Sequence, residues 1–386
     1  MSAGSHPRVA SGLALPLYGG FLLTGVATVL LGPLIPELRE RWQTSTPQLA
    51  LLFVAQFVAS SAGSVVSSFH LPRSLVVGYA CLALGLAALM WSGWPLALAA
   101  MALIGLGLGM AIPATNLTVA HLHPERRGGA LNLLNVLWGL GAATSPLLLA
   151  LFAGRLPTQW KMLVLAALAG SVALAMTLPR NRLAVAAIAT PPAGLAVATG
   201  GALDLLPFAG MLFLYVGVEN AIGGWLVTLG DRVLGTRALA SLLIGSAFWA
   251  ALLGGRAIAP LVLRRLAEPA LYGGSLAVAA AGALILAAAG TWPAVAVGAG
   301  LAGIGLAPLF PLTVSMLAAA TAATRSRTTG WVFGLGGLGG ATLPWLAGQG
   351  SARGMGLVPI AGLLALAALF AAGRGGVLGR AAAGSG

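Results

Sequence analysis

The chain has 386 residues, of which 59% are hydrophobic and 7% are charged, and its mean hydropathy is +0.98. Soluble domains carry about 25% charged residues, so this composition excludes a soluble enzyme, a nucleic-acid-binding domain and a disordered protein. The net charge is +13, from 20 Lys and Arg against 7 Asp and Glu. We expect these cations in short loops, where they set membrane topology, rather than on a nucleic-acid surface. The composition therefore predicts an all-α polytopic membrane protein.

Apolar segments long enough to cross a bilayer follow one another along the chain. A transmembrane helix needs about 20 such residues. The first segment stays apolar as far as Pro36, which is too long for the apolar region of a cleavable signal peptide. Twelve membrane-spanning helices are predicted, at residues 13–36, 47–69, 73–93, 95–120, 128–153, 161–178, 205–229, 238–263, 269–289, 292–320, 328–350 and 356–372.

Basic residues predict the orientation. With twelve spans both termini lie on one side, which carries 13 of the 20 Lys and Arg residues, against 7 on the other side. Loops rich in Lys and Arg stay in the cytoplasm. The sequence therefore predicts a multi-pass protein of the cell inner membrane with both termini cytoplasmic.

The longest connection divides the spans six and six. We expect an N-terminal six-helix bundle at 1–178, a cytoplasmic linker at 179–203 and a C-terminal six-helix bundle at 204–386. Shifting the chain on itself by 198 residues places Pro113 on Pro311 and Gly141 on Gly339, with further Gly matches in three pairs of spans. Transporters built from two parallel repeats have a pseudo-two-fold axis along the membrane normal and bind solute between the halves.

Four stretches carry a family resemblance. They read GFLLTGVATVLLGPLIP at 20–36, GLGLGMAIPATN at 105–116, PERRGGALNLLNVLWGLG at 124–141 and FLYVGVENAIGGW at 213–225. With these stretches the chain resembles the major facilitator superfamily over essentially its whole length, and within it the fucose–glucose permease group of sugar:cation symporters. The resemblance implies two pseudo-symmetric six-helix bundles that expose a central site alternately to the two sides of the membrane. The L-fucose permease pattern has acidic residues where Gly32 and Ile112 stand here, while Asn116 remains.

Glu219 is the one acid of seven that falls near the centre of a predicted span. A charge at the bilayer centre is costly, so such a residue faces the bundle interior or a wet cavity and is a functional candidate. We expect Glu219 to couple transport to H+, or to Na+ as one oxygen ligand. Arg256 is a possible partner of Glu219, but it is predicted about 10 Å nearer the cytoplasm, at 1.5 Å rise per residue, which favours a gating lock between helix ends. Pro113 and Pro311 are predicted to bend their spans and to serve in gating.

Amides and aromatic rings in the middle of spans are suited to a small polar solute. Asn132, Asn135 and Trp138 recur every three residues, so they form one stripe on a helix. Tyr215 and Glu219 are four residues apart and share a face. Hydrogen bonding between helices is the alternative explanation for any single amide. The predicted solute-binding residues are Gln56, Asn116, Asn132, Asn135, Trp138, Tyr215, Glu219, Asn220 and Trp225.

The function predicted first is secondary active transport of a small polar solute, with a hexose as the expected substrate, coupled to H+ or Na+ or to neither. The alternative is a major facilitator exporter of lipophilic drugs or metabolites that works by proton antiport. No ATP-binding, nucleophile–base or metal-binding motif is present, so we expect no catalysis, cofactor or metal. We expect a monomer in the lipid bilayer, with no nucleic-acid partner.

Overall fold

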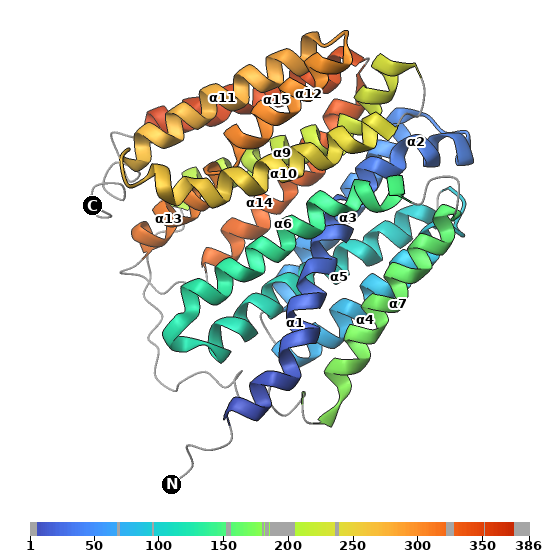
Figure 1. Ribbon diagram of the computed structural model, residues 1–386, viewed down its shortest axis with the longest axis vertical. Helices are drawn as coiled ribbons and strands as arrows, with labels where there is room; N and C mark the ends of the chain where they lie inside the picture. Colours follow the sequence, from blue (N-terminus) through green and yellow to red (C-terminus); the bar gives the residue numbers. More distant parts are fainter. Residues whose placement is uncertain are drawn as a thin grey trace. The chain divides into compact units, whose positions relative to one another are not determined.

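The computed structural model describes residues 6–67, 70–94, 96–151, 156–179, 181, 185, 205–235, 239–321, 328–350 and 352–373. Within this part of the chain all regular secondary structure is helical (Figure 1). The predicted linker at 179–203 and both chain ends lie almost wholly outside the described residues.

Each predicted span corresponds to a helix or to a pair of consecutive helices. The first half has α1 (His6–Val29), α2 (Leu31–Trp42), α3 (Thr46–Ser67), α4 (Leu71–Leu89), α5 (Leu96–Leu122), the short 3-10 turn η1 (Pro124–Arg126), α6 (Arg127–Leu151) and α7 (Thr158–Thr177). The second half has α9 (Leu206–Leu234), α10 (Leu239–Val262), α11 (Glu268–Ala288), α12 (Trp292–Leu306), α13 (Leu309–Thr321), α14 (Thr328–Gln349) and α15 (Ala352–Gly373).

The lengths and apolarity of these helices confirm a multi-pass membrane protein. Among the described residues, ten segments are long and apolar enough to cross a bilayer, with α12 and α13 counted together as one, or eleven if the bent pair α1 and α2 also forms one span. The remaining predicted span corresponds to α14, an apolar helix of 22 residues. Twelve spans therefore fit the observed helices.

Contacts between Cα atoms group the chain into two units. One unit contains residues 1–30 and 55–193, and the other contains residues 31–54 and 194–386. In the first, α4 packs against α5 and α7, and α1 packs against α6. In the second, α9 packs against α10, α14 and α15, and α11 packs against α12. This grouping assigns 31–54 to the second unit, whereas the predicted domain boundaries are a division of the sequence and stay a prediction.

Two predicted spans are interrupted, and a proline accounts for each break. The first breaks at Leu30, where Pro33 has no N–H to donate to the Val29 carbonyl four residues earlier. The other breaks between α12 and α13, where Pro308 and Pro311 follow each other by three residues.

The predicted bend at Pro311 therefore lies next to a break that begins earlier, at Pro308. In the repeat-related position, α5 continues through Pro113 without a break. A single proline thus leaves that helix continuous, because neighbouring groups and local adjustments can satisfy one freed carbonyl in a membrane helix.

Glycine allows the close approach of helices in both units. A Cβ at Gly25 of α1 would collide with the backbone carbonyl of Trp138 on α6, and one at Gly339 of α14 would collide with the carbonyl of Phe213 on α9. Small residues at such crossings bring backbones together and maximise packing where lipid offers no hydrophobic driving force. Glycines that recur in the sequence therefore lie where helices cross closely within each unit.

Candidate functional site

Glu219 lies half-way along α9, which is the longest helix of the second unit. The helix begins with Pro207 in its first turn, where a missing N–H costs nothing, and ends at Gly235 in the left-handed conformation, with φ of 70°. The side chain of Glu219 is 8% exposed. The helix therefore carries a carboxyl group into the interior of its unit, as the position in the span predicted.

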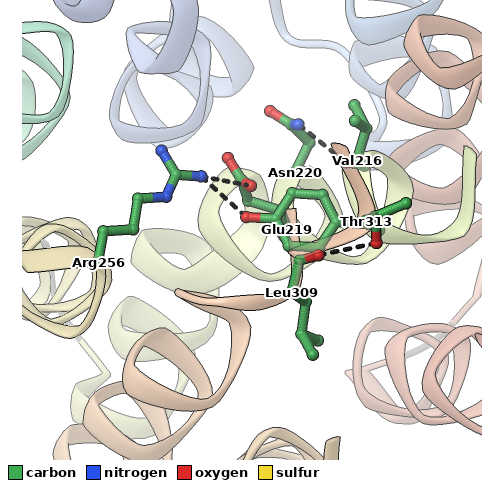
Figure 2. Close-up of polar contacts among 7 residues, drawn as sticks. Val216, Glu219, Asn220, Arg256, Leu309 and Thr313 are labelled. Atoms are coloured by element: carbon green, nitrogen blue, oxygen red, sulfur yellow. Dashed lines mark hydrogen bonds and ion pairs between the residues drawn. The ribbon is translucent and has the colours of Figure 1, made fainter. Parts of the chain in front are cut away.

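Arg256 of α10 is the ionic partner of Glu219. Its Nη2 atom is 3.6 Å from Oε2 of Glu219 (Figure 2). The same Nη2 donates a hydrogen bond of 2.9 Å to the hydroxyl oxygen of Tyr215. The guanidinium of Arg256 therefore contacts both the carboxylate and the phenol, and the three side chains form a single polar cluster, called here the α9–α10 cluster.

An aromatic wall borders this cluster. The guanidinium carbon of Arg256 is 5.9 Å from the ring centroid of Phe310 on α13, and the Tyr215 and Phe310 ring centroids are 5.5 Å apart. A cation over a ring face within about 6 Å is attracted by the quadrupole of the ring. The break between α12 and α13 comes immediately before this turn, so the prolines that cause it also set where Phe310 lies.

The sequence leaves two roles open for Arg256, as a partner of Glu219 or as a lock between helix ends, and favours the lock. The structure brings the guanidinium within 3.6 Å of the Glu219 carboxylate, which favours the partner. Arg256 also lies inside α10, six residues before the helix ends at Val262, and so belongs to no loop. Sequence reasoning missed Phe310, whose only signal was its place two residues after Pro308.

Most of the predicted amides bond to their own helix. Asn116, Asn135 and Asn220 each donate an N–H to the carbonyl four residues earlier, at 2.9, 3.1 and 2.9 Å. Figure 2 shows this bond from Asn220 to Val216 beside the cluster. Gln56 instead donates across helices, from α3 to the Thr28 carbonyl of α1 at 3.0 Å. Gln56 therefore forms a hydrogen bond between helices, which was the alternative to solute binding. Each of the three asparagines uses one side-chain N–H for a hydrogen bond within its own helix.

The predicted stripe on α6 keeps two exposed amides. Asn132 and Asn135 are exposed, and Trp138 is half-buried one turn further along the same helix. Trp225 of α9 is buried, and its indole N–H donates to the Pro344 carbonyl on α14 at 2.8 Å. The structure thus gives Trp225 a hydrogen-bond partner on another helix and leaves Asn132 and Asn135 at the surface of their unit.

We also searched the described part of the chain for side chains that could bind a metal ion. No group of three or more His, Cys, Asp or Glu side chains lies close enough there to hold an ion. The α9–α10 cluster offers a carboxyl group, a guanidinium and a phenol, which can take up a proton, form an ion pair and hydrogen-bond to a solute.

The family follows from these observations and from sequence comparison. The family model of the Major Facilitator Superfamily matches residues 17–268, which is well over half of the chain. The chain belongs to this superfamily of transporters. No curated protein matches the chain in sequence.

Proteins of known structure with the same fold include transporters of different solutes. The Escherichia coli fucose:proton symporter is 20% identical, with a TM-score of 0.56 over 92% of this chain and 97% of that one. A peptide transporter is 13% identical, with a TM-score of 0.73 over 98% and 100%. A bacterial homolog of the human lysosomal transporter Spinster is 14% identical, with a TM-score of 0.66 over 98% of each chain. At these identities the likeness shows the major facilitator fold and leaves the solute open.

Proposed function

We propose that the chain is a secondary active transporter that moves a small polar solute by alternating access, coupled to protons through Glu219. The observation that carries this proposal is the α9–α10 cluster, in which a carboxyl group at the middle of the membrane-spanning helix α9 pairs with a guanidinium from α10. Ionisable residues at this depth are costly and mark solute or proton pathways.

A proton fits this site better than Na+. Arg256 already lies 3.6 Å from the carboxylate, and its positive charge repels a metal cation from the same oxygens. A proton binds covalently to the carboxylate and removes its charge, so it competes with the ion pair directly. Proton coupling is therefore the form of cation coupling that the cluster favours.

A hexose-sized solute is the proposed substrate. The exposed Asn132 and Asn135 on one face of α6, with Trp138 beside them, are groups that bind hydroxyls and an apolar ring face. A fucose:proton symporter, whose solute is of this class, is among the proteins with the same fold. We also propose that the chain transports its solute and does not catalyse a reaction. It would act as a monomer in the inner membrane, with both termini in the cytoplasm. Its two six-helix bundles would comprise residues 1–178 and 204–386.

Glu219→Gln tests the coupling. The amide keeps the size of the side chain and a hydrogen-bond acceptor for Tyr215 and Arg256, but it cannot take up a proton. In proteoliposomes we expect the variant to lose solute accumulation driven by a pH gradient and to retain exchange of solute, because exchange needs no net proton release. Uphill accumulation equal to that of the unaltered protein would remove Glu219 from the coupling path.

The same vesicles separate this function from the exporter alternative. A hexose taken up by counterflow, and competed by its unlabelled form, supports a carrier of polar solutes. Counterflow of a lipophilic cation or dye, with none for polar solutes in protein shown to be folded, would support the exporter instead.

A further inference from the structure

A polar cavity lies at the end of α9, away from the α9–α10 cluster. Its volume is about 620 Å³, and its walls come from α2, from the turn after α2 and from the last turns of α9, all in one contact unit. Arg232 of this wall lies about 20 Å beyond Glu219 along the helix axis, at 1.5 Å rise per residue. Ligand pockets commonly have volumes of about 300–1,000 Å³. The cavity is therefore large enough for a metabolite and is separate from the proposed coupling site.

Two guanidinium groups from different helices line this cavity. Arg39 is in the last turn of α2, and Arg232 is in the last turn of α9. They are close enough for the positive charge of Arg39 to act on the Arg232 guanidinium. A helix dipole favours a cation in each last turn, but it does not explain why two cations from different helices lie near each other. Like charges repel, and an anion between them would offset the repulsion.

Neither guanidinium forms an ion pair with a carboxylate in the described part of the chain. Glu40 and Asp231 also line the cavity and make interactions of their own, but no described ion pair joins them to the two arginines. The Nη1 atom of Arg232 donates to the Sδ atom of Met355 on α15 at 3.5 Å, and a thioether is a weak acceptor. A guanidinium has five N–H donors in a planar fork that matches a carboxylate or a phosphate. The two arginines are therefore suited to bind such a group.

A buried hydroxyl group without a hydrogen-bond partner lines the same cavity. Thr228 of α9 is 5% exposed, and its Oγ1 atom has no partner among the described residues. By contrast, the hydroxyls of Thr28, Thr118 and Thr342 each donate to the carbonyl four residues earlier in their helices. Buried polar groups in native proteins are nearly always hydrogen-bonded, so the exception at Thr228 needs an explanation. A polar ligand in the cavity would supply the missing partner.

We propose that this cavity binds a small organic anion, whose carboxylate or phosphate group lies between Arg39 and Arg232 and whose hydroxyl group bonds to Thr228. Most of the lining residues are polar or charged, so a water-soluble anion fits the cavity better than the acyl chains of a lipid. The anion bridges α2 and α9, which pack against each other, and its binding stabilises that arrangement. It is a ligand in addition to the transported solute, and its site does not depend on the coupling proposed for Glu219.

Equilibrium binding tests the inference. The full chain in an uncharged detergent is dialysed against radiolabelled glycerol 3-phosphate or glycerate, with glycerol as the neutral comparison. Ionic strength is kept low, because salt screens exposed charges. We expect saturable binding of at least one of the two anions and none of glycerol at the same concentrations. Absence of saturable binding for both anions overturns the inference. Displacement of the bound anion by an equal concentration of phosphatidylglycerol would make the ligand a lipid headgroup and also overturns it.

Variants with one guanidinium fewer locate the binding. We expect Arg39→Gln and Arg232→Gln each to raise the dissociation constant of the anion at least about tenfold, because hydrogen bonds to charged groups are the strong ones. Arg41→Gln is the matched control, since Arg41 is in the same last turn of α2 but does not line the cavity. This control should leave the dissociation constant unchanged. Equal losses of affinity in all three variants would show a response to net charge alone and would contradict a site between the two arginines.

Thr228→Val separates binding from packing. The valine keeps the size of the side chain and removes a hydroxyl that has no described partner, so we expect the unfolding temperature without anion to stay the same or to rise. The dissociation constant of the anion should rise about two- to tenfold, the value of one hydrogen bond. A lower unfolding temperature without anion, or an unchanged dissociation constant, would contradict the role of Thr228 in the site.

Discussion

The two repeat-related halves share a scaffold and differ in their polar chemistry. The offset of 198 residues that superposes glycines and Pro113 on Pro311 also places Tyr215 on Leu17 and Glu219 on Phe21. In the opposite direction, Asn116 falls on Val314 and Asn135 on Phe333. The second half thus holds the ion pair, and the first half holds most of the amides. The repeat preserves the residues that pack helices, while the groups able to bind a solute or a proton differ from one half to the other.

Removing one charge from the second half is expected to have the largest effect on stability. Arg256→Ala leaves the buried carboxyl of Glu219 without its cation, and breaking such a pair costs about 3–5 kcal/mol. The double variant Arg256→Ala with Glu219→Gln removes both charges, as in the first half, and recovers most of this loss. Thermal unfolding in detergent compares the two. Equal midpoints for the single and double variants would show that the pair contributes no mutual stabilisation.

The second contrast is between α5 and its repeat, the broken pair α12 and α13. Met110 of α5 stands where the other half has Pro308, and α5 is continuous while its counterpart is interrupted. Met110→Pro introduces the second proline into α5 and is expected to cost about 3 kcal/mol, because it removes a helix hydrogen bond and adds a steric clash. Unfolding measurements on this variant and on Pro308→Ala, which we expect to be milder, check the assignment. If Pro308→Ala lowers the free energy of unfolding more than Met110→Pro does, the break between α12 and α13 contributes more to stability than the continuity of α5.

Replacing a glycine at a helix crossing is expected to cause a loss of stability of intermediate size. Gly25→Val places a branched side chain against the backbone of Trp138, which cannot move aside as a flexible side chain would. Overpacking of this kind costs about 1–3 kcal/mol. Gly19→Val on the same helix is the control, since a Cβ at Gly19 meets no atom within 4 Å. If both variants unfold at the same temperature, the crossing of α1 and α6 is not close enough to require glycine.

These contrasts also show what the sequence could predict. The spans, the repeat and the depth of Glu219 follow from hydropathy and spacing, since a bilayer imposes one helix length and penalises charge at its centre. The pairing of Glu219 with Arg256 follows only as one of two possibilities, because rise per residue locates the backbone of Arg256 and not the end of its side chain. Hydrogen-bond partners do not follow from the sequence: Trp225 was predicted to bind solute, while its indole N–H is bonded to Pro344 on another helix.

The smallest expected effect concerns the amide stripe of the first half. Asn135 is exposed on α6 and donates one N–H to the Leu131 carbonyl, and an amide has a second N–H and a carbonyl oxygen as further hydrogen-bonding groups. If it binds a solute hydroxyl, Asn135→Ala removes a bond worth about 0.5–1.5 kcal/mol, which raises the half-saturation concentration about two- to tenfold. The maximal rate of exchange should change little. Asn116→Ala, whose side chain is half-buried on α5, is the comparison within the same half. An unchanged half-saturation concentration in Asn135→Ala with a lowered unfolding temperature would assign Asn135 to packing.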